Sequence, residues 1–385
     1  MPGPVLLPGV DADAYYEQLG PLRDPLLDDR VSEVMVNGRE QIYVELEGRI
    51  VKTRLSFPDE ESLVRAIQFI ATSVGRRVDE QSPLVDCRLV DGSRVNAVLR
   101  PVAIDGPSLT VRKFARDPYT AEDMIRFGTC SETGFGFIKA CVQARANIIV
   151  TGGTSTGKTT LLNVVSSFIP ERERIVTIED AAELQLQQEH VVRLESRPRD
   201  LAGQGEIPIR TLVVNALRMR PDRIVVGECR AGEALDMLQA MNTGHDGSMT
   251  TLHANTPREA IGRLETLVLM GGLDLPLGAV RRQIAGGIDI FCQVGRLRDG
   301  SRRVTSITEV DKMNEDVVLT QEIFRFEPRG VDSEGRLAGQ FVPTGVRPLI
   351  LDRLLDMGLP IPEELAVLFP DPRPGRFTNP NGRAG

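Results

Sequence analysis

The feature that most restricts how this chain can fold is one glycine-rich run, Gly152-Gly153-Thr154-Ser155-Thr156-Gly157-Lys158-Thr159. The run fits the pattern Gly-x4-Gly-Lys-[Ser/Thr], follows an apolar stretch typical of a strand and opens a stretch typical of a helix. Its glycines let successive backbone N–H groups converge on a phosphate, and the helix start adds partial positive charge. We therefore predict a strand–loop–helix unit that binds phosphate, within an α/β domain.

Two side chains of this loop suit the phosphates of ATP. Lys158 is expected to bridge the β and γ phosphates, and the hydroxyl of Thr159 is placed to ligate a Mg²⁺ ion between them. ATP and Mg²⁺ are therefore the predicted cofactors. The predicted nucleotide-binding residues are Gly152, Gly153, Thr154, Ser155, Thr156, Gly157, Lys158, Thr159 and Thr160.

In the region that contains the loop, short apolar strands alternate with amphipathic helices, a pattern typical of a mainly parallel sheet with right-handed crossovers. This domain is predicted to span residues 131–327, followed by a tail, 328–385, that packs on it or trails from it. The predicted strands are 147–151, 174–178, 223–226, 249–252 and 289–294, and the predicted helices are 158–168, 209–219, 232–241 and 257–270.

Carboxylates end two of these strands and should face the same crevice as the loop. Glu183 is a candidate to polarise the attacking water, and Glu179 or Asp180 to orient the water shell of the metal, although all three also fit a solvated helix start. Glu228 ends the next strand in Gly227-Glu228, where it is expected to serve the metal or to act as the base. The choice of base between Glu228 and Glu183 stays open.

Two of the three histidines, His245 and His253, flank the fourth strand. His253 lies at its carboxyl end and is therefore the better candidate to contact the γ-phosphate. The alternative for either residue is a core histidine bonded to the backbone.

The region before this domain has a different character. We predict a loosely held arm at residues 1–20, an α+β domain at 21–116 and a linker at 117–130, where Asp117-Pro118 and Phe127-Gly128 break the pattern. Asp91-Gly92 favours a tight hairpin turn. The predicted strands are 31–36, 42–51 with a turn at 47–48, 87–90, 94–99 and 108–114, and the predicted helix is 59–74.

Composition argues against some classes of protein. With 46 basic and 54 acidic residues and a net charge of −8, the chain offers no uniform field for a nucleic acid. The five cysteines form no Cys-x-x-Cys pair, which favours reduced thiols in the cytosol. No apolar run is long enough to span a bilayer, so membrane contact is expected to be peripheral.

The order of the motifs resembles that of the type II/IV secretion ATPase superfamily. The phosphate loop is similar to its Walker A motif, Ile178-Glu179-Asp180-Ala181-Ala182-Glu183 to its Asp box, Val226-Gly227-Glu228 to its Walker B motif, and Gly244-His245-Asp246-Gly247 through His253-Ala254-Asn255 to its His box. Residues 33–38, 216–223 and 236–247 resemble the Tad/Cpa pilus-assembly branch. The similarity covers about residues 25–350, and the loop departs from it at Ser155, where relatives commonly have glycine.

The resemblance implies a C-terminal RecA-like P-loop domain preceded by a smaller α+β domain. It also implies a hexamer in which ATP lies between the two domains, and inner-membrane platform proteins as partners on the cytoplasmic side, with no nucleic acid. Arg94 and Arg112 are the matching arginines that would reach the γ-phosphate. Three functions follow: a Tad/Cpa-type pilus or secretion ATPase, a conjugative type IV secretion ATPase and, less favoured, a kinase or nucleic-acid motor.

Overall fold

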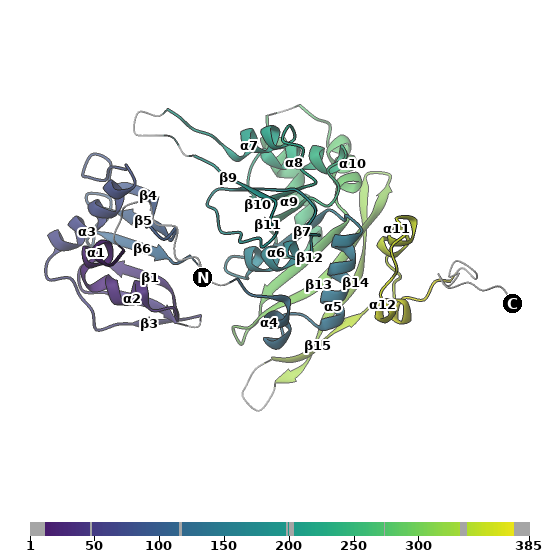
Figure 1. The fold of residues 1–385 in the computed structure, drawn as a ribbon, viewed down its shortest axis with the longest axis horizontal. Helices are drawn as coiled ribbons and strands as arrows, with labels where there is room; N and C mark the ends of the chain where they lie inside the picture. Colours follow the sequence, from purple (N-terminus) through teal and green to yellow (C-terminus); the bar gives the residue numbers. More distant parts are fainter. Residues whose placement is uncertain are drawn as a thin grey trace. The chain divides into compact units, whose positions relative to one another are not determined.

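The computed structural model describes residues 12–46, 48–114, 118–197, 199, 204–272, 274–331 and 337–372. The chain divides into two units, Met1–Asp117 and Pro118–Gly385, whose elements are labelled in Figure 1. Each unit has its own sheet and its own buried core.

The first unit is an α+β domain built on a six-stranded antiparallel sheet with the order β3-β2-β1-β6-β5-β4. Its helices are α1 (Ala12–Glu17), a 3-10 turn (Gly20–Leu22), α2 (Arg23–Leu27) and α3 (Glu60–Ser73). Its strands are β1 (Val31–Asn37), β2 (Ile42–Leu46), β3 (Arg49–Lys52), β4 (Leu84–Arg88), β5 (Arg94–Val98) and β6 (Ser108–Arg112).

Helix α3 shows how local sequence signals build this unit. The carboxylate of Asp59 accepts a hydrogen bond from the backbone of Ser62 and so caps the helix start. Leu63, Ile67 and Ile70 recur at helical spacing and are buried against the sheet, as the sequence predicts. The arm expected at residues 1–20 differs in its described part, because Tyr15, Tyr16 and Leu19 are buried in the same core.

The second unit contains a nine-stranded sheet with the order β15-β14-β13-β12-β7-β11-β10-β8-β9. The strands from β12 to β9 run parallel, and β13 to β15 add an antiparallel extension. The strands are β7 (Ile148–Gly152), β8 (Ile175–Glu179), β9 (Val191–Glu195), β10 (Arg223–Cys229), β11 (Met249–His253), β12 (Ile290–Arg296), β13 (Arg302–Asn314), β14 (Val317–Val331) and β15 (Leu337–Pro343).

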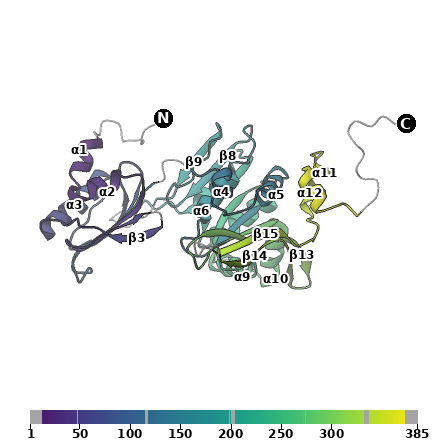
Figure 2. The same ribbon diagram turned by 90° about the horizontal axis from the view of Figure 1, so that it is seen from below.

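Helices cover both faces of this sheet. Ile148 and Val150 of β7 face a core shared with α5, α6, α11 and α12, whereas Ile149 between them faces a core shared with α7 to α10. Figure 2 shows α5 and α6 on one side of the strands and α9 and α10 on the other. The helices are α4 (Ala121–Arg126), α5 (Glu132–Gln143), α6 (Lys158–Ser166), α7 (Ile209–Ala216), α8 (Glu233–Asn242), α9 (Pro257–Met270), α10 (Leu277–Gly287), α11 (Ile350–Asp356) and α12 (Glu363–Leu368).

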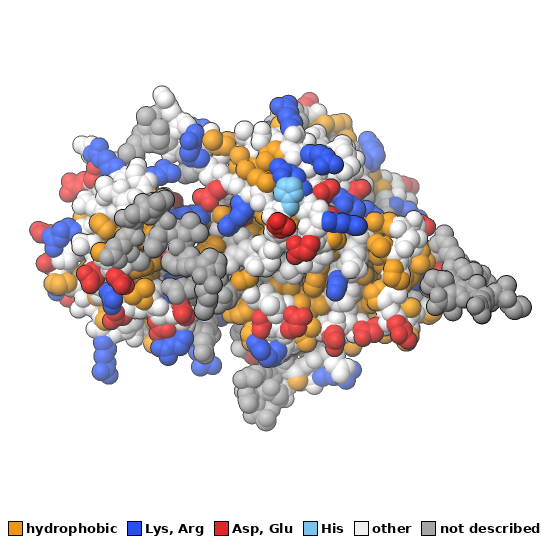
Figure 3. All heavy atoms as spheres, viewed as in Figure 1, with side chains coloured by type: hydrophobic (Ala, Val, Ile, Leu, Met, Phe, Trp, Pro, Cys, Tyr) orange, Lys and Arg blue, Asp and Glu red, His pale blue; other side chains and the backbone are white. Residues whose placement is uncertain are grey.

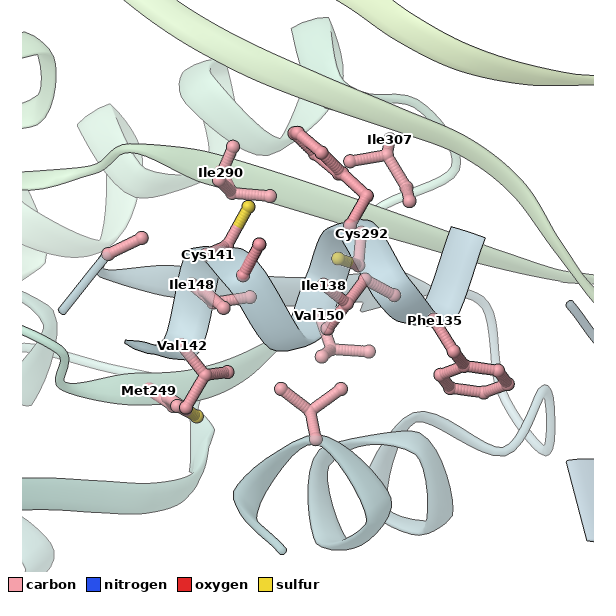
Figure 4. Packing of buried hydrophobic residues seen from close by; sticks show 14 of the residues in the cluster. Phe135, Ile138, Cys141, Val142, Ile148, Val150, Met249, Ile290, Cys292 and Ile307 are labelled. Carbon is pink, nitrogen blue, oxygen red and sulfur yellow. The ribbon is translucent and has the colours of Figure 1, made fainter. Parts of the chain in front are cut away.

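Helix α5 anchors the strand that carries the phosphate loop. Its side chains Ile138 and Cys141 pack with Ile148, Val150 and Cys292 from β7 and β12 (Figure 4). This dense apolar packing fixes the central strand from which the loop departs. None of the described helices is long and apolar enough to cross a membrane.

Two segments differ from the sequence expectation. The described part of the predicted linker, residues 118–130, belongs to the second unit, because Thr120 and Asp123 form a capping box that starts α4 and because Met124 and Cys130 are buried in its core. The predicted tail contributes the end of β14, then β15, α11 and α12, and buries Leu354 and Phe369 against α5.

Candidate nucleotide-binding site

The phosphate loop leaves the centre of the sheet, since β7 lies between β12 and β11 and is buried along its whole length. Gly152 ends the strand at a point with no room for a side chain. A Cβ atom there would lie 2.5 Å from both Thr156 Oγ1 and Val294 O. Thr156 is buried and its hydroxyl donates to Gly153 O at 3.0 Å, which closes the loop on itself.

The loop ends in the start of α6. Gly157 is the N-cap residue with φ of +93°, a left-handed conformation that glycine adopts without strain. Lys158 Nζ donates to Gly153 O at 2.9 Å, so its ammonium group lies over the loop. Thr159 and Thr160 lie in the first turn, and among the described residues no side chain caps this helix. A helix start of this kind favours an anion.

Ser155 stands at the tip of the loop, exposed, with φ of +56°. Residues with a Cβ atom rarely adopt this left-handed conformation. Ser155 therefore replaces the glycine common in relatives at a position where the backbone conformation favours glycine.

The carboxyl edge of the sheet brings the loop together with three predicted residues. Because β7, β11, β10 and β8 are parallel neighbours, their ends lie side by side (Figure 1). His253 is in register with Gly152, Glu228 is the last but one residue of the next strand, β10, and Glu179 ends β8. These residues form one row along this edge of the sheet.

Glu179 is the most buried carboxylate of this row, with 2% of its surface exposed. Its Oε2 atom accepts hydrogen bonds from the backbone of Glu183 at 2.7 Å and of Leu184 at 3.0 Å, which anchors the segment that carries Glu183. Its Oε1 atom is buried with no partner among the described residues. Burial raises the pKa of Glu179 to about 7, and the two backbone bonds offset only part of this effect.

Glu228 is paired with an arginine that the sequence analysis did not single out. Arg230 Nη2 and Nε donate to Glu228 Oε2 at 2.6 and 2.9 Å, and Arg230 Nη1 lies 3.3 Å from Asp180 Oδ2. The carboxylate of Glu228 therefore has a cation beside it within the protein itself. Its position two residues after the glutamate is a local signal that could have identified it.

His253 is exposed and borders an open cavity of about 440 Å³ next to the loop. The cavity is lined by His253, Asn255, Glu259, Arg263 and Thr266, together with Ala254 and Gly262. His245, by contrast, lies in the turn before β11, where its backbone bonds Ala240 and Ser248.

Gly247 of the same turn has a structural role. It has φ of +86°, and a Cβ atom there would lie 1.7 Å from Arg223 Nη1. Arg223 is completely buried and paired with Glu173. This glycine therefore makes room for a buried ion pair.

Arg94 and Arg112 lie in the first unit, directly opposite each other on β5 and β6, and both are exposed. Arg88 continues the row on one side and Glu33 on the other. Like charges at facing positions on neighbouring strands repel each other. Arg112 therefore lies between a like charge, Arg94, and an opposite charge, Glu33.

One further arginine touches the phosphate loop from a distant part of the chain. Arg302, the first residue of β13, donates from Nε to Ser155 O at 3.0 Å. No strand was predicted at this position. The β-branched residues Val304, Thr305, Ile307, Thr308 and Val310 favour a strand and could have revealed it, though not its contact with the loop.

The residues of this edge fit a nucleotide with a divalent cation. The loop is a cradle that admits no side chain at Gly152, and Glu228 and Glu179 supply carboxylates two and three strands away along the same edge. Groups of three or more His, Cys, Asp or Glu side chains gathered as metal ligands are absent from the described ranges. Binding of Mg²⁺ would therefore use Thr159 and the nucleotide itself in addition to carboxylates.

Comparison with known proteins agrees with this architecture. The sequence model of one family, described as "Type II/IV secretion system protein", matches residues 16–323. A Mycobacterium tuberculosis protein named "Putative conjugal transfer protein" is 38% identical over 74% of this chain and 82% of its own length. The type IV secretion system protein VirB11 of Bartonella henselae is 30% identical over 75% of this chain and 91% of its own.

The fold is shared with a solved structure. The ATPase DotB of Legionella pneumophila superposes with a TM-score of 0.53 at 22% identity, covering 80% of this chain and 83% of that one. The predicted fold, a RecA-like P-loop domain preceded by a smaller α+β domain, is confirmed. The predicted superfamily is confirmed as well. The chain belongs to the type II/IV secretion system protein family.

Proposed function

We propose that this chain is a Mg²⁺-dependent ATPase that powers a type II/IV secretion machine. The observation that carries the proposal is the phosphate loop at the carboxyl edge of the sheet, with Lys158 folded over it and with Glu228 and Glu179 two and three strands away along the same edge. Lys158 binds the phosphates, and the backbone of residues 153–159 cradles them. When bound, Mg²⁺ neutralises the charge that develops on the phosphates; Thr159, Glu179 and Glu228 are the residues proposed to hold it.

Glu228 is the proposed general base, with Glu183 as the alternative. Glu228 is held by Arg230, whose second contact with Asp180 ties the ends of β10 and β8 together. This pairing orients the carboxylate before a water molecule is activated. His253, one strand away, is proposed to contact the γ-phosphate.

Assembly and partners follow from the family. We propose a homohexamer on the cytoplasmic side of the inner membrane, in which Arg94 and Arg112 stabilise charge during phosphoryl transfer. Relatives named for conjugal transfer favour a conjugative type IV system, and the resemblance of residues 33–38, 216–223 and 236–247 favours a Tad/Cpa pilus. Lys and Arg side chains are interspersed with Asp and Glu on the face seen in Figure 3, which supports protein rather than nucleic-acid partners.

The test compares ADP binding and ATP turnover in three variants. Lys158→Ala should lose both, because the loop loses its side-chain cation. Glu228→Gln should bind ADP normally and lower kcat by roughly 100-fold. Lys139→Ala, which removes an exposed lysine from α5, is the matched control. Near-normal turnover by Lys158→Ala would rule out the proposed site, and co-purification of the membrane partners would distinguish the two machines.

A further inference from the structure

The hairpin formed by β12 and β13 lies beside the phosphate loop. Val294 of β12 is in register with Gly152, so β12 runs alongside the end of β7 and continues past it. The chain then turns and returns as β13, whose first residue, Arg302, pairs with Arg296. This register carries Arg302 to the tip of the loop, 147 residues away in sequence.

The turn that delivers Arg302 is fixed by its own hydrogen bonds. Leu297 donates from its backbone to Ser301 O at 2.8 Å, and the hydroxyl of Ser301 donates to Asp299 Oδ1 at 2.7 Å. The other oxygen of Asp299 accepts from the backbone of Leu337 at 2.7 Å. Arg302 therefore starts from a well-defined backbone position.

Arg302 contacts the loop at its two left-handed residues. Its Nε atom donates to the carbonyl of Ser155, the residue with φ of +56°. Its Cδ atom lies 3.5 Å from the place where a Cβ atom of Gly157 would stand. The charged hydrogen bond therefore falls on the one residue of the loop that bears a Cβ atom in the left-handed conformation.

We propose that Arg302 is a positioning residue that holds Ser155 in its left-handed conformation and so keeps the loop ready for phosphate. The inference rests on the proposed function. A hydrogen bond from a charged donor is strong enough to offset the unfavourable backbone conformation of one residue. The hydrogen bond from Arg302 thus holds Ser155 in a conformation that a glycine at position 155 would adopt without help.

A double-mutant cycle tests this role, with ADP affinity measured by calorimetry. Arg302→Met keeps an apolar stem over Gly157 but removes the donor, and it should weaken ADP binding by about tenfold. Ser155→Gly relieves the backbone strain. In the Ser155→Gly background, Arg302→Met should therefore change affinity by no more than about twofold. Arg296→Met, which alters the exposed neighbour of Arg302 in the same hairpin, should bind ADP normally.

A second measurement reads the loop without any nucleotide. In the nucleotide-free protein, amide hydrogen exchange of residues 153–158 should be faster in Arg302→Met than in wild type, and unchanged in Arg296→Met. If Arg302→Met lowered ADP affinity equally in the wild-type and Ser155→Gly backgrounds, the guanidinium would contact the nucleotide directly, and the positioning role would be overturned. Normal affinity and normal exchange in Arg302→Met would overturn it as well. Failure of the wild-type chain to bind ADP would refute the proposed function, while the exchange comparison would still decide this inference.

Discussion

Replacement of Glu179 by glutamine should stabilise the nucleotide-free protein, and more so as the pH rises. The pKa of Glu179 is raised from its ordinary value of 4.5 to about 7 in the folded chain. The folded state therefore holds a proton that the unfolded state releases between these two values. Stability is lost as pH rises through this window, and the loss is complete above about pH 7.

The size of the effect follows from the shift. This shift in pKa lowers the free energy of unfolding of the wild-type protein by about 3 kcal/mol at pH 8 and by about 1 kcal/mol at pH 5.5. Glutamine escapes this cost because it stays neutral, while its oxygen still accepts from the backbones of Glu183 and Leu184. The gain of Glu179→Gln over wild type should thus grow by about 2 kcal/mol between these conditions.

Differential scanning calorimetry in EDTA measures this gain in stability as a shift in the melting temperature of the second unit. At about 2–4 °C per kcal/mol, the advantage of Glu179→Gln in melting temperature should be about 4–8 °C larger at pH 8 than at pH 5.5. Glu189→Gln, which changes an exposed carboxylate of the same unit, is the matched control. An advantage of equal size at both pH values, or a loss of stability at pH 8, would refute the assignment of a protonated carboxyl to this position.

Two more substitutions test the arginines of each unit. Arg112→Ala should leave ADP affinity unchanged and lower kcat by at least about tenfold, because the arginine is proposed to act on charge that develops during transfer; steady-state kinetics with unchanged kcat would contradict this. Gly247→Ala should lower the melting temperature of the second unit by several degrees, because the new Cβ would displace Arg223 from its pair with Glu173 and because φ is positive there; an unchanged melting temperature would show that the buried pair can move freely.

Strong local patterns account for what the sequence predicts well. The strands β7, β8, β10, β11 and β12 and the helices α6 to α9 were predicted from their apolar periodicity, whereas α5, α10 and β9 were not predicted. The sheet order then brings Gly152, His253, Glu228 and Glu179 to one edge. Helix α4 was missed because Asp117-Pro118 and Phe127-Gly128 have the composition of a linker, although a capping box starts the helix between them.

Long-range contacts account for most of what the sequence did not predict. The strand β14 carries many exposed polar residues and contains Pro328, so it lacks the apolar run of a central strand. The contact of Arg302 with Ser155 depends on the register of β12 with β7, which no local pattern encodes. The sequence showed only that Ser155 replaces a glycine common in relatives, and it did not show that the backbone of Ser155 is left-handed.

The buried carboxylate of Glu309 ties the C-terminal helix α11 to the sheet of the second unit. Glu309 is 3% exposed on β13, and its two oxygens accept from the backbones of Leu349 and Ile350 at the start of α11. From the same helix, Arg353 reaches Asp289, whose carboxylate also accepts from the backbone of Asn147, immediately before β7.

A shortened protein that ended after β15 would therefore lose more than two surface helices. It would remove both backbone donors of α11 from the buried Glu309, which would keep only the side-chain amide of Gln321 among the donors described here. It would also uncover the rings of Phe137 and Phe324 on which Phe369 packs. Expression boundaries and fusion points for biochemical work should accordingly be placed beyond residue 372, where the described chain ends.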